Sequence, residues 1–106
     1  MCSRVQEFNA EDFERGTSTI NGTEDAQFFK LMLKEQLEYE IKGVDRGNLK
    51  ETIHAIKGIS SYGGLNRLHE ICKKLERYYQ VIEVNYLKVM LEKEFVKIVN
   101  NKDFIK

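Results

Sequence analysis

The chain has 106 residues, of which 42% are hydrophobic and none is Pro or Trp, so it has room for a single domain with one core. Its 17 basic and 17 acidic side chains cancel, which excludes a global field that would draw the chain onto nucleic acid or an anionic membrane. The two cysteines form neither a disulfide framework nor a metal-ligand spacing, and no apolar run reaches the ~20 residues of a membrane span. We therefore expect a soluble, cytoplasmic monomer with reduced thiols at Cys2 and Cys72, the latter in the core.

Residues 1–22 have a weak pattern that predicts a short helix or an extended arm. Asn9 is its candidate cap, and Glu11 and Asp12 would lie in the first turn, where carboxylates favour a helix. Residues 23–106 form the main body of the predicted fold.

A long amphipathic helix is predicted over 23–44, because apolar residues recur there every four positions. The central stripe and three residues that widen it are Phe29, Leu33, Leu37 and Ile41, with Phe28, Met32 and Val44. The segment "KGVDRGN" ends this helix, and either Asp45 or Asn48 can cap the next one. Glu51 stands three residues after Asn48, which is the spacing of a capping box.

The helix that follows is expected to carry an outward-facing histidine. At ~100° per residue, Leu49, Ile56 and Ser60 fall within about 60° of Ile53, whereas His54 falls at about +100°. Lys57 lies on the shoulder between this outer face and the core. The outer face also carries Gly47, Lys50, Gly58 and Ser61.

Two further helices complete the expected fold. After Gly63 and Gly64, apolar residues spaced by three and four run from Leu65 to Ile82, and a last helix covers about 85–100. Four principal helices with short connections predict an all-α, up-down-up-down antiparallel bundle. The core positions of the last two helices would be Leu65, Leu68, Cys72, Leu75, Tyr79 and Ile82, then Leu87, Met90, Leu91, Phe95 and Ile98.

A carboxylate is expected to face His54. If the hairpin pivots near Leu65, His54 at eleven residues before the pivot meets Glu76 at eleven residues after it, because both helices rise equally per residue. A carboxylate there would accept the Nδ1 hydrogen and leave Nε2 free as a nucleophile. Lys57 would place a positive charge beside an anionic group on that nitrogen, and the absence of a side chain at Gly58 would keep the histidine accessible.

This stretch resembles the histidine-containing phosphotransfer (HPt) domain of two-component phosphorelays. The family pattern places Lys-Gly three and four residues after the histidine and ends on Leu-Glu. It is matched by His54, Lys57, Gly58, Ser60, Gly64, Leu68, Cys72, Leu75 and Glu76. Asp45, nine residues before the histidine, also agrees. Tyr62 and Gly63 depart from the commonest family residues, which bears on the choice of partner.

The resemblance implies a phosphorelay intermediate that is not an enzyme and has no nucleotide site or cofactor of its own. His54 would accept a phosphoryl group from the aspartate of one response-regulator receiver domain and pass it to another, with Mg²⁺ bound by the receiver. In the family, the residues matching Lys57, Gly58 and Glu76 neutralise the phosphate, clear the docking surface and orient the imidazole. An upstream hybrid histidine kinase is the implied source, and the chain would be a free protein or a kinase's terminal domain.

Other interpretations of the same residues stay open. The bundle could bind and sequester receiver domains without carrying phosphate. Alternatively, His54, His69 and Glu76 could hold a metal ion, although their spacing gives no compact ligand pair. We expect no metal. The residues predicted to line the docking surface around the histidine are Lys50, Gly58, Ser61, His69 and Lys73.

Overall fold

The computed structural model describes residues 5–106, and within that range the protein is all-helical with no strand. This confirms the predicted all-α class, whereas the expectation for Cys2 concerns a residue outside the described range. Within the same range, no helix is long and apolar enough to cross a membrane. The elements are α1 (Ala10–Thr17), α2 (Glu24–Lys42), the 3-10 helix η2 (Arg46–Asn48), α3 (Leu49–Tyr62), α4 (Asn66–Tyr78) and α5 (Val84–Val99).

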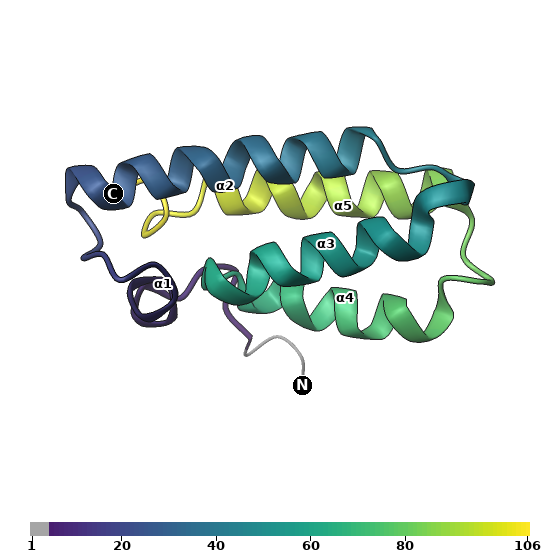
Figure 1. Cartoon of the computed structure of the whole chain (residues 1–106), viewed down its shortest axis with the longest axis horizontal. Helices are drawn as coiled ribbons and strands as arrows, with labels where there is room; N and C mark the ends of the chain where they lie inside the picture. Colours follow the sequence, from purple (N-terminus) through teal and green to yellow (C-terminus); the bar gives the residue numbers. More distant parts are fainter. Residues whose placement is uncertain (1–4) are drawn as a thin grey trace.

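Four long helices lie along the long axis of the molecule, and α1 lies at one end (Figure 1). In that view α2 lies beside α5, and α3 lies beside α4 below them. The α2–α3 and α4–α5 connections are both at the end opposite α1. The closest packing is between α3 and α4, so the surface that carries the candidate site rests on this helix pair.

The apolar stripes of the sequence form one continuous core. The inward positions predicted for α3 are all buried, and Cys72 of α4 is fully buried as expected. The core also includes Phe8 and Phe13, so the segment that precedes α2 packs on the same core as the bundle. The buried residues of the four long helices include Leu33, Leu37, Ile41, Leu49, Ile53, Ile56, Leu68, Leu75, Leu87, Leu91 and Ile98.

Polar caps explain where the helices begin, and they correct one prediction. The Asn9 side chain accepts a hydrogen bond from the Asp12 amide at 2.9 Å, so the predicted cap of α1 is confirmed. The capping box lies one turn earlier than the predicted Asn48–Glu51 pair, because Asp45 and Asn48 exchange side-chain bonds across η2. The chain makes a 3-10 turn before α3, and the Asn48 amide oxygen is already committed to Asp45 and Thr52.

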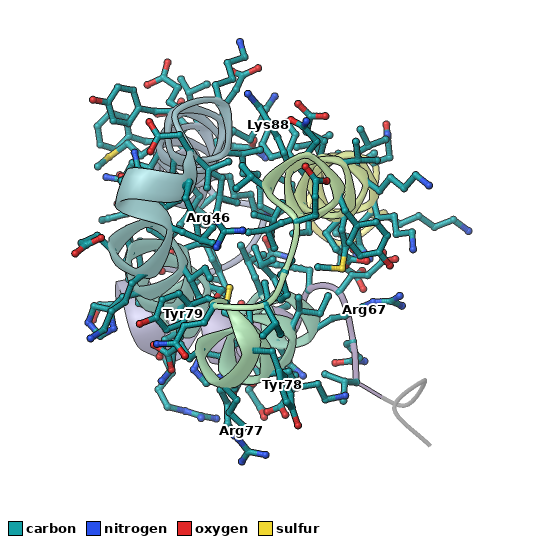
Figure 2. All side chains as sticks on the ribbon, turned by 90° about the vertical axis from the view of Figure 1, so that its right-hand side faces the viewer. Arg46, Arg67, Arg77, Tyr78, Tyr79 and Lys88 are labelled. Atoms are coloured by element: carbon teal, nitrogen blue, oxygen red, sulfur yellow. The ribbon has the colours of Figure 1, made fainter. Side chains whose placement is uncertain are left out.

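Two further predictions about the helices were wrong. Phe28 does not widen the α2 stripe, since it is 61% exposed and lies on the opposite side of the helix from Leu33. The helix predicted to continue to Ile82 ends at Tyr78. Beyond it the chain turns, and the Arg46 guanidinium donates to the carbonyl of Tyr79 at 3.1 Å and to that of Ile82. Figure 2 shows Arg46 and Tyr79 at this end of the molecule.

The core contains two charged side chains that the apolar pattern did not indicate. Lys30 is 3% exposed and its ammonium lies 5.4–5.7 Å from the ring centres of Phe8, Phe13 and Phe104. It donates to the Asn21 side chain and to the carbonyls of residues 103 and 106. Glu94 is 4% exposed. Lys30 therefore joins segments from both ends of the described chain to α2.

Candidate functional site

His54 projects from α3 into solvent, on the face opposite the core. Its side chain is 80% exposed, whereas its neighbours Ile53 and Ile56 are buried beneath α3. The helical periodicity of the apolar residues fixes this orientation, because the stripe that buries Ile53 and Ile56 turns position 54 outward. The predicted exposure of His54 is confirmed.

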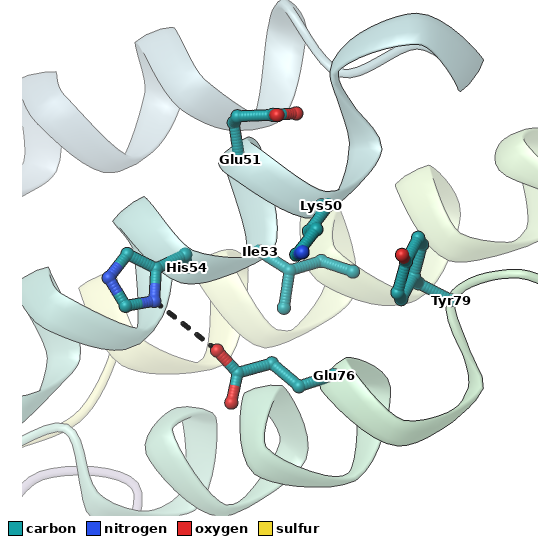
Figure 3. A pocket seen from close by; sticks show the side chains of 6 residues that line it. All are labelled: Lys50, Glu51, Ile53, His54, Glu76 and Tyr79. Atoms are coloured by element: carbon teal, nitrogen blue, oxygen red, sulfur yellow. Dashed lines mark hydrogen bonds and ion pairs between the residues drawn. The ribbon is translucent and has the colours of Figure 1, made fainter.

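Glu76 of α4 lies beside the imidazole, as the hairpin arithmetic predicted. Its Oε2 is 3.4 Å from Nδ1 of His54, and its side chain is 31% exposed. When the ring proton is on Nδ1, the ring donates to this oxygen and Nε2 keeps its lone pair. Figure 3 shows the other ring nitrogen pointing away from Glu76, so one edge of the imidazole is held and the other faces solvent.

Lys57 holds the second oxygen of the same carboxylate. Its Nζ donates to Oε1 of Glu76 at 2.9 Å, a contact that sequence reasoning did not foresee. The hydrogen bond from Lys57, followed by that from His54, lowers the pKa of Glu76 below its ordinary value of 4.5. Glu76 is therefore ionised at neutral pH and bridges an ammonium group and an imidazole.

Gly58 gives open access to His54 on the next turn of α3. A Cβ built at Gly58 would meet nothing within 4 Å, so this glycine does not serve a close approach between helices. Gly64 differs, because its φ is +71° and a Cβ there would lie 2.5 Å from the carbonyl oxygen of Asn9. The turn between α3 and α4 thus requires glycine for structural reasons, whereas position 58 does not.

The remaining predicted docking residues fall into separate groups. Lys50 lines a groove together with His54. Ser61 and His69 line a different hollow that is completed by residues of α1. Lys73 forms an ion pair with Glu70 at 3.4 Å. Within residues 5–106, no three His, Cys, Asp or Glu side chains gather as a metal site, so the structure does not bring His54, His69 and Glu76 together as ligands.

The groove beside the histidine lies between α3 and α4 and has a volume of about 460 Å³. Its lining includes Tyr79 (Figure 3), a residue that sequence reasoning placed in the core. The signal was available, because the pivot arithmetic that pairs His54 with Glu76 also pairs Glu51 with Tyr79. The full lining is Lys50, Glu51, Ile53, His54, Glu76 and Tyr79.

Cys72 lies behind this site but does not share its chemistry. It is fully buried, and burial, with a smaller contribution from Glu76, raises the pKa of its thiol to about 12. Reactive cysteines need an accessible thiolate. Cys72 is therefore a packing residue, as the apolar pattern of α4 predicted.

Comparison with known proteins assigns the family. The family model described as "Hpt domain" matches residues 31–94, a segment that runs from α2 into α5 and includes the whole α3–α4 pair. No curated protein and no solved structure matches the chain. Hpt domains transfer phosphoryl groups through a histidine in two-component phosphorelays, and they are carriers without a kinase site. Because the match covers more than half of the chain and contains the His54 surface, this protein belongs to the Hpt domain family.

Proposed function

We propose that this protein is a phosphorelay intermediate in which Nε2 of His54 is the phosphoryl acceptor. The observation that carries the proposal is the shared carboxylate of Glu76, which contacts Nδ1 of His54 at 3.4 Å and Lys57 at 2.9 Å. This contact orients the exposed ring from one side only. The opposite nitrogen is then the nucleophile that an incoming phosphate meets.

The transfer step needs no proton transfer by the protein. The Nε2 lone pair attacks the phosphorus of an aspartyl phosphate, the phosphorus–oxygen bond to the aspartate breaks, and the carboxylate leaves with the bonding electrons. The imidazole becomes a phosphorylated imidazolium, and the ionised Glu76 next to Nδ1 stabilises its positive charge. The reverse sequence returns the phosphoryl group to the aspartate of a second receiver.

Lys57 and Gly58 have supporting roles in this proposal. Lys57 lies one turn from His54, and its ammonium can compensate the phosphoryl charge in addition to holding Glu76. The open space above Gly58 leaves room for the receiver surface that delivers the phosphate. The Mg²⁺ that assists phosphoryl transfer belongs to the receiver domain, and this chain contributes positioning and charge.

The proposed partners are an upstream hybrid histidine kinase and a downstream response regulator, each through its receiver domain. We place this activity in the cytoplasm and assign it to a monomer. We also propose that α2 to α5 form an antiparallel four-helix bundle over 23–106. Residues 1–22 form an additional N-terminal segment. The buried Cys72 suits a compartment where thiols are reduced.

The experiment that tests the proposal is transfer of labelled phosphate from a phosphorylated receiver domain to the full chain. We expect label that is stable in base and lost in acid, as for a phosphoramidate, and no label on His54→Gln. His69→Gln is the matched control and should label normally, because His69 lies in the separate hollow near α1. Labelling of His54→Gln at the wild-type rate would refute the assignment.

A different outcome would favour the interaction module. If several receiver domains bind the chain but none transfers phosphate to it, while the receivers remain active toward another Hpt domain, then the protein sequesters receivers and His54 is part of a binding surface only.

A further inference from the structure

The groove beside His54 is on the side of the imidazole that does not take part in phosphoryl transfer. Nδ1 and Glu76 face the groove, whereas Nε2 points away from it (Figure 3). A phosphoryl group on Nε2 would therefore leave the groove open. The chemistry proposed for His54 does not explain why an accessible hollow of about 460 Å³ lies directly behind the ring.

The groove combines an apolar wall with groups that have no partner. Ile53 forms its base and is 1% exposed, and the ring of Tyr79 forms its far side. Within residues 5–106, neither the Tyr79 hydroxyl nor the Lys50 ammonium has a hydrogen-bond or ion-pair partner. In Figure 3 the Lys50 amine is drawn over Ile53, between His54 and Tyr79, and the carboxylate of Glu51, which also belongs to the lining, lies apart from it.

Lys50 differs in this respect from the other two lysines expected around the histidine. Lys57 is paired with Glu76 at 2.9 Å, and Lys73 is paired with Glu70 at 3.4 Å. Lys50 is therefore the lysine of this group whose charge is available to a partner carboxylate. An unpaired ammonium at the edge of an apolar hollow is suited to a surface that offers an apolar side chain next to an acidic one.

The groove is built by contacts far from the histidine. Arg46 donates to the carbonyl of Tyr79 at 3.1 Å, and η2 is fixed by the capping box between Asp45 and Asn48. These bonds hold the turn after α4 against the start of α3, and they set the position of the Tyr79 ring. Lys50 follows in the first turn of α3, so both distinctive side chains of the groove are positioned by the same junction.

A receiver domain that reaches Nε2 must also cover this groove. Specific protein interfaces bury about 800 Å² on each partner, which corresponds to a patch of about 16 Å radius. The groove contacts the imidazole itself, so it lies well inside such a patch centred on His54.

We propose that the groove between Lys50 and Tyr79 is a partner-selecting subsite, in which a receiver domain places an apolar side chain against Ile53 and Tyr79 and an adjacent carboxylate on Lys50. The inference rests on the proposed function, because the occupant is the receiver that exchanges phosphate with His54. It adds two specificity-determining residues, Lys50 and Tyr79, that do not touch the phosphoryl group.

The test compares Lys50→Glu with Lys34→Glu in the full chain. Both lysines are exposed, and replacing either with Glu changes the net charge by the same amount. Lys34 lines a distant hollow between α2 and the C-terminal segment, so Lys34→Glu controls for charge alone. For a receiver domain that labels His54, we expect Lys50→Glu to lower the association rate constant about tenfold at low salt. The deficit should narrow in 0.5 M NaCl, and Lys34→Glu should change the rate less than twofold.

Phosphoramidate separates docking from chemistry. This small phosphodonor loses ammonia as its phosphorus–nitrogen bond breaks and the Nε2–phosphorus bond forms, and it needs no receiver surface. Lys50→Glu should accept phosphate from phosphoramidate at the wild-type rate while accepting it slowly from the receiver. Equal slowing with both donors would place Lys50 in the phosphoryl chemistry and overturn the subsite.

Tyr79→Ala tests the apolar half of the groove. We expect dissociation of the receiver to accelerate about tenfold or more, because an aromatic wall is removed from the interface, with thermal unfolding used to confirm that the variant folds. Receiver binding that is the same for wild type, Lys50→Glu and Tyr79→Ala would overturn the inference. This result is distinguishable from failure of the proposed function, in which the wild-type chain itself takes no phosphate on His54.

Discussion

The carboxylate of Glu76 serves two groups with different charges. One oxygen accepts from the ammonium group of Lys57 and the other lies against the imidazole of His54. Lys57 therefore fixes the carboxylate that fixes the ring, and the exposed histidine is oriented by residues that are themselves only partly exposed. Because an ion pair that remains partly open to solvent adds little to folding stability, we attribute the value of this arrangement to positioning.

Replacing Glu76 should affect transfer more than folding. Glu76→Gln keeps the size of the side chain but removes the charge that would stabilise the phosphorylated imidazolium in the proposed reaction. We expect single-turnover transfer from a phosphorylated receiver to slow on the order of tenfold to a hundredfold. The free energy of unfolding in urea should change by less than about 1 kcal/mol.

Glu70→Gln is the matched control, because Glu70 also lies on α4 and pairs with a lysine, Lys73, at 3.4 Å. It should leave transfer unchanged. A Glu76→Gln variant that transfers phosphate at the wild-type rate but unfolds several kcal/mol more easily would show that the carboxylate is structural.

The lowered pKa of Glu76 predicts a pH dependence with a defined sign. A carboxyl whose pKa is lower in the folded state than its ordinary value of 4.5 adds stability above that value, and the contribution is lost as pH falls through the folded pKa. The free energies of unfolding of wild type and Glu76→Gln in urea should therefore differ at pH 7, and the difference should shrink as pH falls below 4.5. If wild type and Glu76→Gln still differed by the same free energy of unfolding at pH 3, hydrogen bonding to the ionised Glu76 carboxylate would not be the cause of that difference.

At the level of single elements, α3 contains a glycine that its own helix does not need. Glycine in a helix interior costs about 0.5–1 kcal/mol relative to alanine, and nothing lies within 4 Å of a Cβ at position 58. The open space makes Gly58 a surface feature. Gly64 and Gly16 are different, because a Cβ there would lie 2.5 Å from the Asn9 carbonyl oxygen or 2.1 Å from that of Tyr62.

Substitutions at Gly58 should separate stability from docking. Gly58→Ala should raise the free energy of unfolding by about 0.5–1 kcal/mol, measured in urea. Gly58→Gln should fold equally well but weaken receiver binding by about tenfold in calorimetry, because its side chain would occupy the approach to His54. As a control, Gly64→Ala should destabilise the fold by more than about 1 kcal/mol, and undiminished receiver affinity of Gly58→Gln would contradict the access argument.

The helices themselves follow closely from the apolar periodicity, but their junctions do not. The stripe of α3 correctly turned His54 outward, since a period of 3.6 leaves little freedom once Ile53 and Ile56 are buried. The end of α4 was placed too late because Tyr79 and Ile82 continue the spacing, and only the tertiary bonds from Arg46 divert the chain after Tyr78. The 3-10 turn at 46–48 shifted the capping box to Asp45 for a similar local reason.

The candidate site was predictable to the extent that it follows from helix geometry. Counting from Leu65 placed Glu76 beside His54, because two packed helices of equal rise keep their register. The bond between Lys57 and Glu76 was not predictable by that count, which sets Lys57 opposite Lys73. A long lysine side chain can reach along the neighbouring helix, and its rotamer is decided by the carboxylate that it finds there.

For the whole molecule, the buried ammonium of Lys30 joins the two ends of the described chain. It sits among three phenylalanine rings, one from the segment before α1, one from α1 and one from the C-terminal segment. It also donates to carbonyls of residues 103 and 106. Lys30 occupies a core position of α2, three residues before Leu33 and four after Ala26. The helical spacing of the apolar residues therefore predicts that position 30 is buried, whereas the charge of a lysine predicts that it is exposed.

Removing this lysine should loosen both ends together. Lys30→Ala leaves a cavity between the rings and removes a donor from several oxygens, so we expect the free energy of unfolding to fall by about 2–4 kcal/mol. Hydrogen exchange should accelerate in α1 and in residues 101–106 more than in α3. Lys34→Ala, one turn along on the exposed face, should change stability by less than about 0.5 kcal/mol, and faster exchange confined to one end would refute a shared anchor.

The one-sided support of the imidazole also has a regiochemical consequence. If His54 is the phosphoryl acceptor that we propose, Glu76 against Nδ1 favours the τ regioisomer of phosphohistidine, and the same nitrogen would serve when phosphate arrives and when it leaves. Donor and acceptor receivers would then approach the phosphorus in the same geometry, so the second transfer would follow the path of the first in reverse. A relay built on such a carrier runs in either direction, and the relative phosphorylation potentials of its partners set the direction of flow.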